Sequence, residues 1–164
     1  DYNGEGDWSA EEIARRYQVY CRALRIDTRT DLTPMAHTEG ATQRVYPVMD
    51  KVIAGIEAGD AACRSIGVDF VEQDAKFPFG KTLKSNTARA LRRSALTEEE
   101  RERLRRRFVS MMLRGQVPHE FKEYAKLLRK IGLGEWRERL TAGADRENPY
   151  VMRYYRYLTE ADGE

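Results

Sequence analysis

Cysteine and histidine are scarce in this 164-residue chain, which has two of each. Cys21 and Cys63 stand far apart without a CxxC spacing, a pattern that excludes a zinc finger and a disulfide framework. Cys63 lies in a short apolar run, which predicts a buried thiol and the reducing cytoplasm as the location. No GxSxG, HExxH or Cys–His signature occurs. We therefore predict no catalytic residue, no cofactor and no metal ligand, and favour a non-enzymatic protein.

Long hydrophobic runs are also missing, since the longest runs are far shorter than the roughly 20 residues that cross a bilayer. The N-terminus lacks the basic-then-apolar pattern of a signal peptide. We expect neither a membrane partner nor an export signal. With 41% hydrophobic and 34% charged residues, the composition is typical of a globular domain that has an unusually ionic surface. The length predicts one domain over residues 1–164, with residues 1–8 as a flexible, Gly-rich and acidic tail.

Strand patterns are absent as well, because we find no convincing period-two alternation and no Asn-Gly hairpin. Apolar residues instead recur at three- and four-residue spacing, and helix-capping signals stand at Ser9, Asp60, Thr97 and Asn148. A further helix is predicted from about Thr42, opened or kinked by Pro47. The sequence thus predicts an all-α, single domain of about seven helices. It is either a helical-hairpin array, similar to a short α-solenoid, or an irregular bundle.

The longest predicted loop runs from Asp27 to Gly40, and it is aperiodic. Its polar residues Asp27, Asp31, His37 and Glu39 are of the types that bind metals, but turn formation explains the two aspartates better. An enzyme of unrecognised type with a site near residues 27–40 remains one alternative function.

Acidic residues are missing between Asp74 and Glu98, and this gap is the strongest asymmetry in the sequence. The net charge is −6 for residues 1–75, +8 for residues 76–114 and zero for the rest, giving the overall +2. A helix from 97 to 114 carries its own acids and pairs internally. The segment from Lys76 to Arg93 has no local acid, so its charge requires compensation by the acidic N-terminal helices, by ions or by an anionic partner.

This basic segment is the predicted binding face, and its site residues are Lys81, Lys84, Arg89, Arg92 and Arg93. We predict a helical interaction or scaffold module that binds an acidic protein surface or other polyanion through that face. Nucleic-acid binding through the same face is the alternative, and it requires steep salt dependence. The sequence does not indicate an oligomeric state.

The stretch A-K-F-P-F-G-K-T, residues 75–82, ends in Gly80, Lys81 and Thr82 and resembles the tail of the phosphate-binding loop of P-loop nucleotidases. The resemblance covers eight residues and departs at Ala75, where the motif has glycine. That loop follows a buried strand, whereas residues 69–74 are polar and predict a helix. A helix N-terminus that meets a simple anion is the alternative for Lys81 and Thr82.

Overall fold

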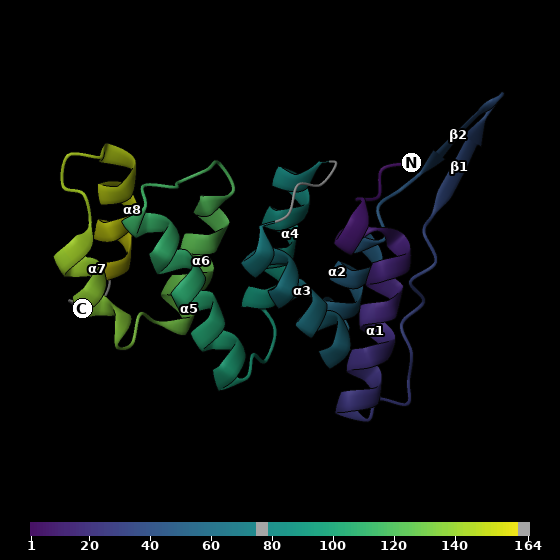
Figure 1. Ribbon diagram of the computed structural model, residues 1–164, viewed down its shortest axis with the longest axis horizontal. Coiled ribbons are helices and arrows are strands. Elements are labelled where there is room, and N and C mark those ends of the chain that lie inside the picture. Colours follow the sequence, from purple (N-terminus) through teal and green to yellow (C-terminus); the bar gives the residue numbers. More distant parts are fainter. Residues whose placement is uncertain (75–78, 161–164) are drawn as a thin grey trace. The chain divides into compact units, whose positions relative to one another are not determined.

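The computed structural model describes residues 1–74 and 79–160 and confirms the all-α class (Figure 1). The described residues form eight α-helices, one 3₁₀ helix and one two-stranded sheet. The chain divides into two compact units, unit 1 from Asp1 to Ala95 and unit 2 from Leu96 to Glu164. Each unit is described by itself below, and the single domain over 1–164 stays a prediction.

Unit 1 contains four α-helices, the 3₁₀ helix and the sheet. Its elements are η1 (Gly6–Trp8), α1 (Ala10–Leu24), β1 (Ala36–Glu39), β2 (Thr42–Val45), α2 (Met49–Glu57), α3 (Ala61–Gln73) and α4 (Gly80–Arg92). Two predicted caps are confirmed. The Ser9 hydroxyl accepts a hydrogen bond from the Glu12 amide at 3.2 Å, and the Asp60 carboxylate accepts from the amides of Ala62 and Cys63. Each cap satisfies amides that a helix start leaves without intrahelical partners.

The core of unit 1 lies where α3 packs against α1, α2 and α4. Helices α2 and α3 are joined by the short turn Ala58–Asp60 and pack together, as expected for a helical hairpin. Gly55 permits a close approach, because a Cβ there would lie 2.3 Å from the Cys63 sulfur. The largest fully buried side chains of this unit are Ile13, Met49, Ile66, Phe70 and Leu91.

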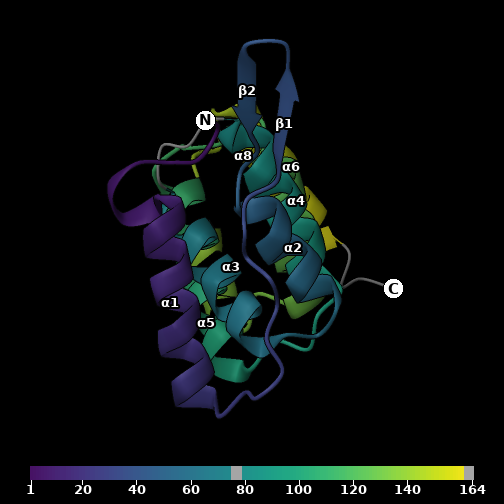
Figure 2. The ribbon, with the colours of Figure 1, turned by 90° about the vertical axis from the view of Figure 1, so that its right-hand side faces the viewer.

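A β-hairpin replaces part of the predicted loop and the start of the predicted helix. Ala36 pairs with Val45 and Glu39 with Thr42, and Gly40 turns the chain with φ +62°. The prediction of no strands is therefore wrong, and so is the helix start at about Thr42, which lies in β2. Of the two roles predicted for Pro47, opening the helix is confirmed, since α2 begins at Met49. Strand alternation was not visible because seven of the eight strand residues are exposed and the eighth, Val45, is only half-buried, so no apolar face marks the strands. The hairpin stands away from the helices (Figure 2), and α2 begins only after Pro47.

The N-terminal segment, predicted to be a flexible tail over 1–8, makes defined contacts. The Tyr2 amide donates to the Val45 carbonyl at 2.8 Å, and the Val48 amide donates to the Asn3 side chain at 2.7 Å. The Trp8 ring is buried, and its Nε1 donates to Gln73 at 3.1 Å. These bonds join the segment to β2 and α3.

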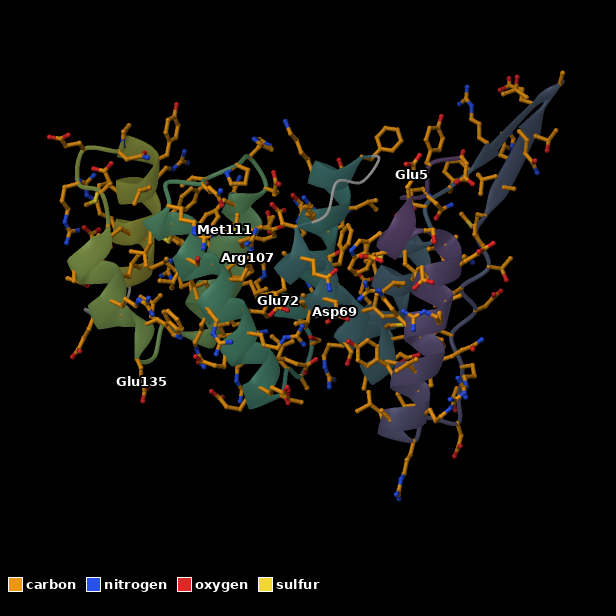
Figure 3. All side chains as sticks on the ribbon, viewed as in Figure 1. Glu5, Asp69, Glu72, Arg107, Met111 and Glu135 are labelled. Atoms are coloured by element: carbon orange, nitrogen blue, oxygen red, sulfur yellow. The ribbon has the colours of Figure 1, made fainter. Side chains whose placement is uncertain are left out.

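Asp69, the first residue of the polar stretch 69–74, is buried on α3 with 5% of its surface exposed. The carboxylate of Asp69, which is labelled in Figure 3, accepts from the Tyr20 hydroxyl at 2.5 Å and lies 3.4 Å from the Arg16 guanidinium. Both partners belong to α1. The Arg16 guanidinium also lies over the Trp8 ring at 4.3 Å. The acid is buried because α1 brings it two partners that the sequence of α3 does not reveal.

Unit 2 contains α5 (Glu98–Leu113), α6 (Phe121–Ile131), α7 (Trp136–Gly143) and α8 (Pro149–Thr159). Thr97 and Glu100 form the predicted capping box, and Asn148 caps α8 with Pro149 at its first position. Helix α6 begins at Phe121 after a turn in which the Pro118 carbonyl accepts a hydrogen bond from the Phe121 amide.

The core of unit 2 forms where α5 packs against α6 and α7, and α6 packs against α8. The rings of Phe108 and Tyr124 stack at 4.7 Å across α5 and α6. Among the helices of the described residues, none is both long enough and apolar enough to cross a membrane.

Candidate functional site

Helix α4 presents the predicted basic residues, and no acidic residue lies between Gly80 and Arg93. Lys81, Arg89 and Arg93 are exposed, and Arg92 is half-buried. At 3.6 residues per turn, positions 89, 92 and 93 lie about 80°, 20° and 120° around the helix from position 81, so the four residues share one broad outer side of α4. We call these four residues the α4 basic face.

Lys84 does not share this exposure. It is 8% exposed, and its ammonium lies 2.6 Å from the carboxylate of Asp74. Asp74 ends α3 in the left-handed conformation, φ +48°, which directs the chain toward α4. Lys84 lacks an acid nearby in sequence on its own helix, and Asp74 at the end of α3 supplies one. Lys76 lies outside the described residues.

An aromatic hollow of about 360 Å³ borders the α4 basic face. Its walls include Tyr2, Tyr46 and Phe79, and the ring centres of Tyr2 and Phe79 lie 5.1 Å apart, edge to face. Asn86 of α4 also lines the hollow, and its side-chain oxygen accepts from the Arg89 guanidinium at 2.7 Å. This hydrogen bond places a cation of the basic face directly beside the aromatic walls.

The carboxylate of Asp50 also lines the aromatic hollow. Partial burial raises the pKa of Asp50 above its ordinary value. Arg44, from β2, lines the same hollow. The hairpin and the start of α2 thus supply polar groups to a hollow whose rings come from three separate segments.

Phe79 has a backbone conformation that large residues rarely adopt. Its φ is +56°, and its side chain is 62% exposed immediately before α4. The left-handed conformation costs an L-residue roughly 1–2 kcal/mol, and an exposed ring recovers little of that by burial. Strain of this kind concentrates at functional positions, so Phe79 is a candidate contact residue.

The loop of residues 27–40 borders a second hollow, of about 310 Å³, lined by Thr28, Thr30 and Asp60 among others. Both oxygens of Asp60 are occupied. One accepts from Tyr17 at 2.5 Å and Thr30 at 2.7 Å, and the other accepts from two amides of α3. The Thr30 amide in turn donates to the Tyr17 hydroxyl at 2.7 Å. Asp60 therefore joins α1, the loop of residues 27–40 and α3 through its hydrogen bonds.

This network changes the acidity of its members. Burial alone would raise the pKa of Asp60, but hydrogen bonds from Tyr17, Thr30 and the α3 amides hold it below its ordinary value. Burial and the hydrogen bond to Asp60 raise the pKa of Tyr17. Burial, followed by the nearby Asp60 carboxylate, raises the pKa of the Cys63 thiol to about 12. Cys63 is therefore an unreactive, buried thiol at neutral pH.

The other polar residues of the loop do not form a cluster. Asp27, His37 and Glu39 are exposed, and Asp31 accepts from the Thr33 amide at 2.9 Å in a local turn. Within residues 1–74 and 79–160, no group of three or more His, Cys, Asp or Glu side chains is placed to hold a metal ion.

The surroundings of the P-loop-like stretch differ from those of a nucleotide site. The preceding element, α3, is a helix rather than a buried strand, and Gly80 opens α4 directly. Ala75 to Pro78 lie outside the described residues.

Sequence reasoning missed a second basic surface, in unit 2. Lys122, Lys126 and Arg129 recur on α6 at four- and three-residue spacing, opposite tyrosines of α8. Only Val151 and Leu158 of α8 are buried, so the tyrosines of this helix keep exposed surface. The spacing of the α6 cations was the available signal, but the neutral net charge of this part of the chain concealed it.

Comparison of the chain with protein-family models, with curated proteins and with solved structures gives no match.

Proposed function

We propose that the protein is a non-enzymatic helical interaction module that binds an acidic protein segment at the α4 basic face and the adjoining aromatic hollow. The observation that carries this proposal is the hydrogen bond between Arg89 and Asn86, because it joins an exposed cation to the wall of the aromatic hollow. The bound segment would place carboxylates against Lys81, Arg89 and Arg93, and an apolar side chain against Phe79.

Two features support a protein partner at this surface. Aromatic and arginine side chains that surround a hollow are the residues on which protein interfaces concentrate their binding energy. The hollow is also large enough for one side chain of the partner, and the cations beside it provide the charge complementarity that steers association. Lys84 takes no part, since its charge is already held by Asp74.

Fluorescence anisotropy with short labelled peptides tests the proposal. One peptide is rich in Asp and Glu around a single central Phe, a second has the Phe replaced by Ser, and a third has Lys in place of the acids. The first peptide should bind most tightly. Arg89→Glu with Arg93→Glu should abolish its binding, and Phe79→Ser should weaken it toward that of the second peptide.

The matched control is Arg106→Glu, because Arg106 is an exposed arginine of α5 outside this surface. It should leave binding unchanged, and all variants should retain the helical circular-dichroism signal of the parent. Equal binding of the acidic and basic peptides, or full binding by the Arg89→Glu, Arg93→Glu variant, would refute the proposal.

Nucleic acid is the alternative ligand for the α4 basic face, and the same variants test it. A labelled oligonucleotide bound there should lose affinity steeply between about 50 and 200 mM salt, and should be released by Arg89→Glu with Arg93→Glu. We also propose a cytoplasmic location, which the two buried, free thiols of Cys21 and Cys63 support.

A further inference from the structure

Two adjacent hollows lie along the face of unit 2 where α6 packs against α8. Their volumes are about 420 Å³ and about 140 Å³. They share the side chains of Lys122, Arg153 and Tyr154, so they form one continuous groove. We call it the α6–α8 groove, and its lining also includes His119, Lys126, Tyr150 and Tyr157.

The groove is lined by positive charge. Lys122 and Arg153 are exposed, and no carboxylate of the described residues lines either hollow. Lys126 is partly compensated, because its ammonium lies 3.6 Å from Glu123. Two or three cations therefore face a groove with no acid of its own, which requires an anionic occupant or solvent ions.

Tyrosine rings lie between these cations. Tyr150 is 66% exposed, and Tyr154 and Tyr157 follow along α8 at intervals of about 6 Å and about 4.5 Å of helix rise. Arg129 already covers the Tyr157 ring at 4.6 Å, whereas the Arg153 guanidinium lies 5.9 Å from the Tyr154 ring. Tyr150 is thus the ring with the most surface open to a planar ligand.

We propose that the α6–α8 groove binds single-stranded nucleic acid. Lys122, Lys126 and Arg153 contact successive phosphates, and an unpaired base stacks on Tyr150. Cations that follow a backbone, with aromatic rings between them, are the arrangement by which proteins hold single strands without reading their sequence. A duplex keeps its bases stacked inside, so it offers no base to Tyr150.

An acidic protein segment fits the groove less well. Carboxylate side chains would satisfy the cations, but they lack the flat π-face with which an unpaired base stacks on the Tyr150 ring. This site is separate from the α4 surface and does not depend on the function proposed for it.

The test uses the whole chain and fluorescein-labelled single strands of mixed sequence, as DNA and as RNA, with the matching duplex and a poly-glutamate of equal charge as competitors. Binding is followed by fluorescence anisotropy. We expect the single strands to bind more tightly than the duplex or poly-glutamate. The logarithm of the affinity should fall with the logarithm of salt concentration with a slope of roughly −2, from three phosphate contacts on a single strand.

Three variants assign the binding to the groove. Lys122→Glu with Arg153→Glu should abolish binding, and Tyr150→Ala should weaken it roughly 5- to 150-fold, the loss expected for one stacked base. Tyr150→Phe should restore binding, because the ring and not the hydroxyl is used. Arg106→Glu, a charge reversal at an exposed residue of α5 that does not line the groove, should bind as the parent does.

Several results would overturn the inference. The first is the absence of any anisotropy change with single strands at low salt. The second is unchanged affinity for single strands in the Lys122→Glu, Arg153→Glu variant. The third is an affinity for the duplex or for poly-glutamate equal to that for single strands. Unaltered affinity in Tyr150→Ala would also overturn it, because binding would then rest on charge alone. Failure of the α4 variants in the peptide assay leaves these readouts unaffected, so the two proposals are tested separately.

Discussion

The ammonium of Lys84 lies 2.6 Å from the carboxylate of Asp74, so the charge in the middle of the basic segment is compensated within unit 1. The Lys84 side chain is 10% exposed and that of Asp74 is 32% exposed, so solvent screens the pair from one side only. Helix α4 therefore carries two kinds of cation. One holds α4 against the end of α3, and the others face outward.

Lys84→Ala should therefore lower the free energy of unfolding by about 1–3 kcal/mol, because it leaves Asp74 half-buried without its cation. Urea denaturation measures the loss. Lys81→Ala is the matched control on the same helix, and its exposed side chain should contribute less than about 0.5 kcal/mol. Asp74→Asn keeps a residue that tolerates the left-handed backbone and completes a double-mutant cycle, in which additive losses would contradict the ion pair.

The carboxylate of Asp60 should make stability depend on pH in acid. Its pKa in the folded state is held below the ordinary 3.8, so its contribution is fully present above that value and is lost as the pH falls through the folded-state pKa. Asp60→Asn retains a good helix cap but removes the acceptor for Tyr17 and Thr30. It should cost about 1–2 kcal/mol near neutral pH.

The difference between Asp60→Asn and the parent should narrow as the pH is lowered to about 3, as measured by denaturation at each pH. Asp27→Asn, an exposed residue at the start of the same loop, is the control and should change stability little at any pH. A constant difference across this range would show that the charge of Asp60 is not what the network uses.

Gly55→Ala should destabilise unit 1, although the same change in a helix usually stabilises by about 1 kcal/mol. The added Cβ would lie 2.3 Å from the Cys63 sulfur and 3.0 Å from its Cβ, so α2 and α3 must move apart. Overpacking of this kind costs about 1–3 kcal/mol. Thermal or urea unfolding measures the effect.

Cys63→Ala removes the sulfur that the new methyl group would meet, so it provides an internal control for Gly55→Ala. The double variant should lose less stability than the sum of the two single changes. Simple additivity would mean that the two helices do not approach at this point.

Arg105 should be more important for unit 2 than the arginine beside it. Its Nε and Nη2 atoms donate to the carbonyls of Gly132 and Ile131 at 2.8 Å each, which closes the end of α6, and its Nη1 lies 2.8 Å from Glu98. Arg105→Lys should lower the free energy of unfolding by about 1–3 kcal/mol, because a point charge cannot make this fork of bonds. Arg106→Lys, at an exposed position, should be silent, and equal effects at the two positions would contradict the assignment.

Most of the secondary structure could be predicted because its signals are local. Ser9, Asp60, Thr97 and Asn148 cap the helices that follow them, since a side-chain oxygen two or three residues before an amide needs no tertiary contact to bind it. The hairpin of β1 and β2 was not predicted because neither of its faces is buried. Its strands therefore lack the alternation of apolar and polar residues that marks a half-buried strand.

The candidate sites could be predicted only in part. The absence of acids around α4 indicated a basic helix correctly, but the sequence placed Lys84 on its outer side, and burial against Asp74 depends on where α3 ends. The aromatic hollow joins Tyr2, Tyr46 and Phe79 from three segments, and the α6–α8 groove joins cations of one helix to rings of another. Neither grouping exists within any single stretch of the chain.

By itself, the sequence determined the helical class, the caps and the asymmetry of charge, because each depends on residues within a few positions of one another. The tertiary structure decided which charged side chains are buried and which lie on the surface. Asp69 and Lys84 are buried because other helices bring them partners, whereas Arg89, Arg93, Lys122 and Arg153 stay on the surface. The physical reason is that the cost of burying a charge depends on what packs against it, and packing joins residues that are distant in sequence.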